Sequence, residues 1–217
     1  MRKLNLFAML FALMTSCQTE DVNPELRKSN YLPLEVGNYW VYQHYRIESV
    51  GNEFLLEEVD SVVITKDTII RNERYFVMEG ISSSPLWNKT EIVRDSSKHL
   101  VNHLGQILFS EINFTDVLYT YYECQNELND TLLSISYQME NPEMEVTVPA
   151  GTFEVLNYKG NLVVIKEELC PEELHNRILN RYYALNIGKI LHTYYYVHSS
   201  YTFERRLVRY QLVNQDK

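Results

Sequence analysis

Short runs of alternating apolar and polar residues recur along most of the chain, and this pattern limits most strongly what the chain can fold into. In residues 39–47 (YWVYQHYRI), Tyr39 and Val41 fall on one face, and Trp40 and Tyr42 fall on the other. Side chains alternate between the two faces of a β-strand, so a period of two predicts strands. The 17 Tyr residues favour the same structure, because aromatic side chains pack well on a pleated surface.

The same pattern, separated by turn signals, predicts about a dozen strands. We expect them at residues 39–47, 58–65, 74–78, 90–93, 99–101, 106–109, 132–138, 143–148, 153–158, 162–166, 189–197 and 203–212. Their connections are too short for crossover helices, which implies antiparallel pairing. Only residues 171–180 (PEELHNRILN) have helical character.

These features predict an all-β fold with at most one short helix. A sheet of this many strands usually curls, closes or splits into layers. Closure also protects the unpaired edges of a sheet. We therefore expect a strongly curved antiparallel sheet or a partly open β-barrel.

Residues 1–16 have the features of a signal peptide. Arg2 and Lys3 precede an apolar run, residues 4–14, that is too short for the roughly 20 residues needed to cross a bilayer. The stretch at residues 13–17 (LMTSC) resembles a bacterial lipobox, with Met14 where leucine is usual. The resemblance implies cleavage before Cys17 and attachment of acyl chains to it. The alternative is an ordinary signal peptide with an incidental Cys17.

The rest of the chain divides into an anchored linker and one domain. Residues 17–30 form the lipidated anchor and a polar, flexible linker, and residues 31–217 form a single β domain. We expect this domain to sit in water, anchored by lipid to the outer membrane, on its periplasmic or cell-surface side. Glu20 and Asp21 resemble the acidic signals of some surface lipoproteins and favour the surface.

The charge of the chain limits its partners. Without residues 1–16 the chain keeps 18 of its 20 basic residues and all 29 acidic ones, a formal charge of −11. Such a field repels nucleic acid and anionic lipid head groups, so we expect neither as a partner. The expected partners are the membrane, through acyl chains on Cys17, and an apolar ligand, a glycan or another envelope protein.

Two further cysteines, Cys124 and Cys170, would lie in an oxidising compartment where a disulfide can persist. The sequence leaves two alternatives open, a disulfide between them or two buried thiols. A disulfide requires Cα atoms within about 7 Å of one another, which sequence does not reveal.

Three short blocks resemble a family of uncharacterised Bacteroidota cell-envelope lipoproteins. They are residues 32–42 (LPLEVGNYWVY), 148–153 (VPAGTF) and 183–190 (YALNIGKI), which resemble the family's PL-x-x-GN-x-W-x-Y, VPAGTF and Y-A-x-x-x-G-x-V blocks. The resemblance spans most of the mature chain in the same order. It implies a curved antiparallel sheet, distantly similar to periplasmic lipoprotein carriers, and implies no particular activity.

The blocks also make sense as structure. Gly37 and Asn38 can adopt a positive φ at a turn into a strand, where Trp40 then supplies a large apolar plug. Gly151 permits a hairpin turn, and Gly188 does the same before the following strand. We interpret these residues as mainly architectural, with ligand contact by Trp40 or the Gly151 turn as the alternative.

No common catalytic or metal-binding motif is present in the sequence. His99 and His103 have the i, i+4 spacing of a zinc-binding helix, but the glutamate is missing. On a strand, their Cα atoms would lie about 13 Å apart. Ser82, Ser83 and Ser84 lack the second glycine of a nucleophile elbow, and no glycine-rich phosphate loop occurs. We therefore expect no catalytic residues, no metal and no cofactor.

The tyrosines exceed what a core needs, because a buried tyrosine must still satisfy its hydroxyl. The candidates for an aromatic binding face are Trp40, Tyr42, Tyr183 and Tyr195; the alternative is a solvated amphipathic surface. We interpret the chain as a non-enzymatic binding module of the cell envelope. Two alternatives stay open: an accessory subunit of an outer-membrane complex, and a hydrolase with a dispersed site. An apolar-lined pocket would favour ligand binding, whereas a filled interior would favour a partner protein.

Overall fold

The structure is a computed structural model that describes residues 30–82, 89–125, 130–141, 143–170, 172–175, 177–197 and 199–213. The predicted signal peptide, Cys17 and the linker up to residue 29 lie outside the described residues. Within the described part, no helix has the length and apolar character needed to cross a bilayer.

The described chain is built from β-strands and two single-turn 3₁₀ helices. The strands are β1 (Tyr39–Ile47), β2 (Glu53–Ile70), β3 (Glu73–Ser82), β4 (Thr90–Asp95), β5 (His99–Asn102), β6 (Ile107–Ser110), β7 (Tyr119–Gln125), β8 (Asp130–Glu140), β9 (Glu145–Val148), β10 (Gly151–Val164), β11 (Ile178–Leu179), β12 (Arg181–Ala184), β13 (Gly188–Tyr194) and β14 (Thr202–Gln211). The 3₁₀ turns are η3 (Glu167–Leu169) and η4 (Glu172–Leu174).

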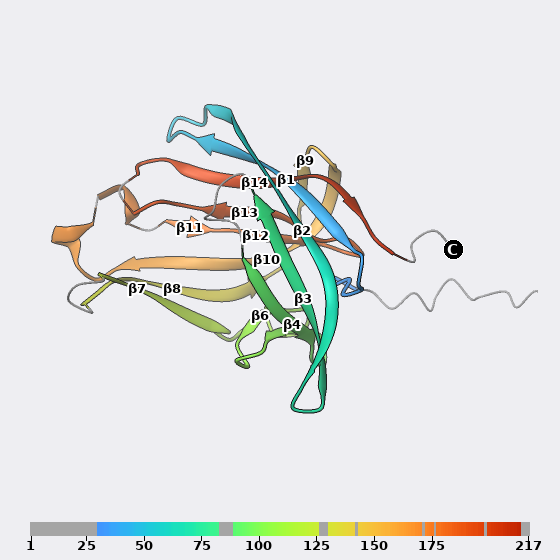
Figure 1. Cartoon of the computed structure of the whole chain (residues 1–217). Helices are drawn as coiled ribbons and strands as arrows, with labels where there is room; N and C mark the ends of the chain where they lie inside the picture. The colour runs from blue at the N-terminus through green and yellow to red at the C-terminus, as the bar shows by residue number, and fades with distance from the viewer. Residues whose placement is uncertain are drawn as a thin grey trace, which may run out of the picture.

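All strands belong to one antiparallel sheet (Figure 1). Its order is β6-β5-β4-β3-β2-β1-β14-β13-β12-β10-β8-β7, and β9 and β11 each pair with β10. The sheet curls until its two ends approach, and the hydroxyl of Tyr158 on β10 donates to the carbonyl of Ile107 on β6 at 3.0 Å. The fold is therefore all-β and nearly closed into a barrel, which confirms the predicted fold class.

Two predicted strands are in fact one. Residues 153–158 and 162–166 were expected to be separate strands, yet β10 runs unbroken from Gly151 to Val164. Gly160 has a packing role, since a Cβ there would lie 2.6 Å from the ring of Tyr137 on β8. That ring stacks on Tyr158 with centroids 4.9 Å apart.

The helix predicted at residues 171–180 is wrong. One turn, η4, forms there, and the chain then pairs with β10 through β11, where Ile178 lies opposite Asn161. Leu174 and Leu179 are both buried in the core. Tertiary packing of these apolar side chains thus overrides the local helical preference. Strands β7, β11 and β12 are additions that the alternation pattern did not predict.

The interior holds two apolar clusters. The first joins β6, at one end of the sheet, to strands near the other end. Phe109 of β6 packs against Tyr183 of β12 with ring centroids 4.2 Å apart, and Ile135 and Tyr137 of β8 belong to the same cluster. The second surrounds Trp40, Ile190 and Leu207, three buried residues of β1, β13 and β14. A cavity remains between the two clusters.

The three sequence blocks form turns and ties around this interior. Gly37, Gly151 and Gly188 all have positive φ, at 98°, 144° and 96°. Asn38 does not, so that expectation is wrong for this residue. Its buried side chain instead donates to the carbonyl of Pro33 at 2.7 Å and accepts from the backbone N–H of Val213 at 2.7 Å. Asn38 therefore ties the beginning of the domain to its last strand.

The two cysteines of the domain are not bonded to each other. Cys124 is exposed near the end of β7, and Cys170 is buried after η3. The possible disulfide between Cys124 and Cys170 therefore does not form. Burial, followed by the charge of Glu168, raises the pKa of the Cys170 thiol, which keeps it in the neutral form.

We expect Phe109→Ala to destabilise the domain strongly, because Phe109 is fully buried and joins β6 to the opposite end of the sheet. Truncation of a buried phenylalanine typically costs about 3–5 kcal/mol. Urea unfolding followed by circular dichroism measures this loss. Ile112→Ala, two residues beyond β6 and 57% exposed, is the control and should cost less than about 0.5 kcal/mol. Equal stability of the two variants would contradict closure through Phe109.

Candidate ligand-binding cavity

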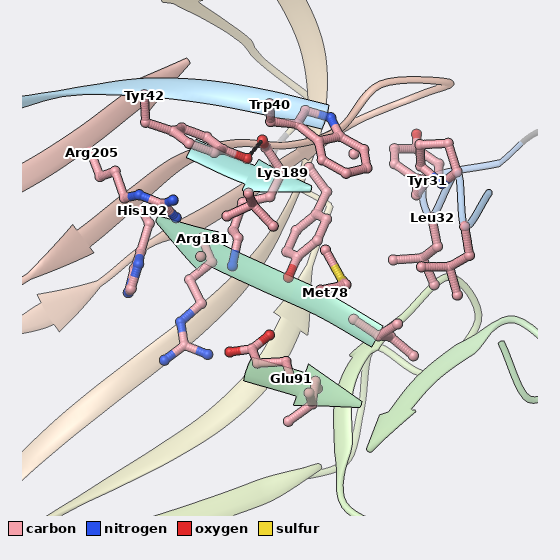
Figure 2. A pocket seen from close by; sticks show the side chains of 18 of the residues that line it. Tyr31, Leu32, Trp40, Tyr42, Met78, Glu91, Arg181, Lys189, His192 and Arg205 are labelled. Atoms are coloured by element: carbon pink, nitrogen blue, oxygen red, sulfur yellow. Dashed lines mark hydrogen bonds between the residues drawn. The ribbon is translucent and has the colours of Figure 1, made fainter. Parts of the chain in front are cut away.

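The curled sheet encloses a cavity of about 180 Å³. Its wall is formed by β1 to β6, by β12 to β14 and by residues 31–34, which precede the first strand. Lys89 and Glu91 are exposed members of this wall, so the cavity opens to solvent beside them. Figure 2 shows Tyr31 and Leu32 on one side of it and Arg181 on the other.

One side of the cavity is apolar. The side chains that form it come from strands far apart in the sequence and from the segment before β1. They are Tyr31, Leu32, Leu34, Val62, Met78, Leu100 and Leu108. Removal of such a surface from water is favourable, so this side of the cavity favours an apolar group as its occupant.

The aromatic side chains of β1 are fixed by hydrogen bonds to the opposite wall. Trp40 Nε1 donates to the carbonyl of Ile187 at 2.7 Å, and the hydroxyl of Tyr42 donates to the carbonyl of Lys189 at 2.8 Å. Gly188 lies between these two acceptors, and a Cβ there would be 3.6 Å from Trp40 Nε1. The polar atoms of both rings are thereby satisfied, which leaves the rings available as an apolar wall.

A buried ion pair lies at the polar side of the cavity. Arg205 on β14 donates from Nε to Asp60 Oδ1 at 2.8 Å and from Nη2 to Oδ2, and both side chains are almost fully buried. His44 Nε2 donates to the same carboxylate at 2.9 Å, and in that tautomer Nδ1 accepts from the hydroxyl of Tyr194. The guanidinium of Arg205 also lies 3.9 Å from the centre of the Tyr42 ring.

These contacts determine the charge of Asp60. Burial alone raises the pKa of a carboxyl group, but the hydrogen bonds from His44 and Arg205, together with the charge of Arg205, outweigh it. The pKa of Asp60 is therefore lowered, and the carboxylate is ionised at neutral pH. Asp60 and Arg205 neutralise each other within the wall.

The register of the sheet extends the polar side across four strands. His44 lies opposite Arg205, Arg205 lies opposite His192, and His192 lies opposite Arg181. Directly opposed residues share a face of the sheet, so this row faces the interior. Burial, reinforced by Arg181 and Lys189, lowers the pKa of His192 well below its usual value, so its imidazole is neutral at physiological pH.

Lys189 joins the row because of an irregularity in the sheet. Arg181 and Tyr182 pair with His192 and Leu191, but Tyr183 pairs with Lys189, so the register skips Ile190. A bulge of this kind re-aims the side chains that follow it. Lys189 and His192 therefore both line the cavity, although residues three apart on a regular strand face opposite sides.

The sequence predicted part of this site. Of the four candidate aromatic residues, Trp40, Tyr42 and Tyr183 line the cavity together. Tyr195 does not line it. Tyr195 follows β13, packs against the first apolar cluster and lies near the guanidinium of Arg177, whose carbon is 5.9 Å from the ring centre.

The charged residues of the site were missed. The sequence does contain a signal for two of them. Asp60 lies an even number of residues from the buried Ile64 on β2, and Arg205 lies an even number from the buried Leu207 on β14, so each charge shares a face with a buried apolar side chain. Opposite charges on the apolar faces of two strands indicate a buried pair. The pattern contained no such signal for Lys189, because its orientation depends on the bulge.

The cavity has the features of a binding site rather than of a metal centre. Among the described residues, no three His, Cys, Asp or Glu side chains come close enough together to hold a metal ion. The chemistry present is an apolar wall, two satisfied aromatic side chains and a set of cations.

Comparisons with known proteins add little to this geometry. No protein-family model and no curated protein matches the chain. A crystal structure of a protein from Parabacteroides distasonis, provisionally described as a lipoprotein, is 11% identical, has a TM-score of 0.45 and covers 84% of this chain and 99% of that one. A similarly described exported protein with a YmcC-like fold from Bacteroides fragilis is 12% identical, with a TM-score of 0.44 and coverage of 85% and 100%. Likenesses of this strength reveal nothing about ligand or activity.

We expect Asp60→Asn to destabilise the protein by about 3–5 kcal/mol, because it leaves Arg205 charged and buried without a counter-charge. Since the pKa of Asp60 is lowered in the folded state, its contribution is present above the unfolded pKa of about 3.9 and is lost as the pH falls below that value. Urea unfolding at pH 7 and at pH values from 5 down to 2 measures both effects.

The control for this variant is Glu53→Gln, which breaks a surface ion pair with Arg206 in which Glu53 is half-exposed. It should cost less than about 1 kcal/mol. The difference between wild type and Asp60→Asn should shrink below pH 4. A difference that stays constant down to pH 2 would show that the Asp60 carboxylate contributes nothing through its charge.

Proposed function

We propose that this chain is a lipid-anchored protein of the cell envelope and a non-enzymatic binding module that holds the apolar part of a small ligand in the cavity. The cavity itself carries this proposal. It lies inside an otherwise packed sheet, between two apolar clusters, and is lined by Trp40, Tyr183 and several aliphatic side chains.

The size of the cavity supports a ligand rather than a packing defect. Its volume of about 180 Å³ is similar to that of an engineered cavity of roughly 150 Å³ that binds benzene. Apolar side chains that line an open cavity face water. A ligand that displaces this water with an apolar group therefore gains the free energy of burial.

The polar groups of the cavity support binding more than catalysis. The carboxylate of Asp60 is already engaged by Arg205 and His44, so it is not available as a base. His192 is neutral. The hydroxyl of Tyr194 donates to His44, but burial raises the pKa of Tyr194, so this hydroxyl stays protonated. The envelope location is supported by residues 1–17, whose signal peptide and lipobox features are independent of the cavity.

Binding of straight-chain alcohols tests the proposal directly. We expect octanol to bind the purified domain, and the affinity to rise about fourfold for each added methylene, since burial of one CH₂ contributes about 0.8 kcal/mol. Isothermal titration calorimetry with butanol, hexanol and octanol measures this series.

Two tryptophan variants provide the matched pair for this experiment. Leu108→Trp places a large ring in the cavity wall and should abolish octanol binding. Ile112→Trp adds the same ring at an exposed position beyond the same strand and should leave binding unchanged. If wild type and both variants fail to bind octanol, and native mass spectrometry of envelope-purified protein shows only a partner protein, the chain is an accessory subunit instead.

A further inference from the structure

The cavity differs in charge from the rest of the molecule. The whole chain has a formal charge of −9, yet the charged residues of the cavity wall are four cations and two anions. The cations are Lys89, Arg181, Lys189 and Arg205, and the anions are Asp60 and Glu91. The repulsion expected from the overall charge therefore does not extend to a ligand inside the cavity.

Three of these six charges have partners. Arg205 is neutralised by Asp60 through two hydrogen bonds. Arg181 donates from Nη2 to the hydroxyl of Tyr137 at 2.9 Å, and its guanidinium lies 4.4 Å from the centre of that ring. Arg181 Nε, however, is buried and has no hydrogen-bond partner among the described residues. Arg181 thus retains both its charge and a free donor.

Lys89 is exposed to water, and Lys189 is the least compensated of the cations that are not exposed. Its side chain lines the cavity, and its ammonium makes no hydrogen bond and no ion pair within 4 Å with any residue in the described part of the chain. Burial lowers the pKa of Lys189 to about 8; Glu91 of β4 and Asp60 of β2 act against this shift, while Arg181 of β12 and Arg205 of β14 add to it. The amine is therefore still mostly protonated at pH 7.

No carboxylate of the described residues forms an ion pair within 4 Å of this protonated amine, and Glu91 and Asp60 act on it only from farther away. Removal of a charge from water costs several kcal/mol unless an opposite charge and hydrogen bonds compensate it. His192, on the same strand, is neutral and does not supply the missing charge. An anionic group that reaches Lys189 would supply both the charge and the acceptors.

The apolar side of the cavity lies across from these cations. Figure 2 shows Arg181, His192 and Arg205 on one side and Tyr31 and Leu32 on the other, with Trp40 and Lys189 between them. A molecule that satisfies both sides must combine a charged group with an apolar body.

We propose that the ligand is an anionic amphiphile, whose carboxylate or phosphate head binds Lys189 and Arg181 and whose apolar chain lies against Trp40, Tyr183 and the segment around Leu32. This inference rests on the proposed function, because it names the chemistry of the molecule that the same cavity binds. The inference adds a role for Lys189 and Arg181, which binding of an apolar group alone does not require.

Octanoate and octanol separate the two proposals, because they share one chain length and differ in charge. Calorimetry at pH 7 should show octanoate binding at least about tenfold more tightly than octanol, in line with a charge-assisted contact. Equal affinities would overturn the anionic head group while leaving the apolar site intact. Failure of both molecules to bind would overturn both proposals.

Variants then test the role of Lys189. Lys189→Met keeps the length of the side chain without its charge, and it should reduce the preference for octanoate severalfold, to what Arg181 alone provides, while octanol binds as in wild type. Lys66→Met, at an exposed position on β2 outside the cavity wall, should keep the full preference. An undiminished preference in Lys189→Met would overturn the assignment of the head group to this residue.

The pH dependence provides a readout that does not involve mutation. Octanoate stays ionised from pH 7 to pH 10, whereas Lys189 loses its proton as the pH rises through about 8. The preference should therefore decline over this range in wild type and be flat in Lys189→Met. A preference that is constant in wild type up to pH 10 would contradict contact with this amine.

Two phosphate probes complete the test. Octyl phosphate should bind with the same dependence on Lys189, and its affinity relative to octanoate identifies which head group fits better. Inorganic phosphate alone should bind at least about tenfold more weakly than octyl phosphate, because it lacks the apolar chain. Equal binding of the two phosphates would overturn the apolar half of the proposal.

Discussion

The buried ion pair between Asp60 and Arg205 is the interaction on which the interior depends. It joins β2 to β14 across β1, which contributes His44 to the same carboxylate. Isolated charges in such a place would cost several kcal/mol, so the pair is stable only because three donors converge on one acceptor group. The consequence for the cavity is that Arg205 is already neutralised, whereas Lys189 has no hydrogen bond or ion pair from its ammonium within the described chain.

The curvature of the sheet creates the space around this pair. Fourteen strands in one antiparallel sheet would leave two long exposed edges if they stayed flat. Here β6 approaches β10, and packing of Phe109 on Tyr183 and the hydrogen bond from Tyr158 join the two regions. The interior is too wide to be filled by side chains alone. Two packed clusters occupy its ends, and a cavity remains between them.

The three sequence blocks have a physical meaning in this structure. Trp40 and Tyr42 of the first block donate to the carbonyls of Ile187 and Lys189 in the third, and Gly188 between them has a positive φ of 96°, which favours glycine. The first and third blocks therefore build part of the cavity wall. Their residues fix the shape of the site, whereas the charged residues around Lys189 carry the proposed selectivity for an anionic head group.

The sequence by itself determined the fold class, because a period of two is a local property of a strand and identifies it without reference to partners. It also brought Trp40, Tyr42 and Tyr183 forward as candidates, since their composition and alternation are visible along the chain. Only the tertiary structure decided that Tyr195 lies elsewhere, that Cys124 and Cys170 stay apart, and that Lys189 faces the cavity. Each of these depends on which strands become neighbours and where a bulge shifts the register, and neither is encoded in a local pattern.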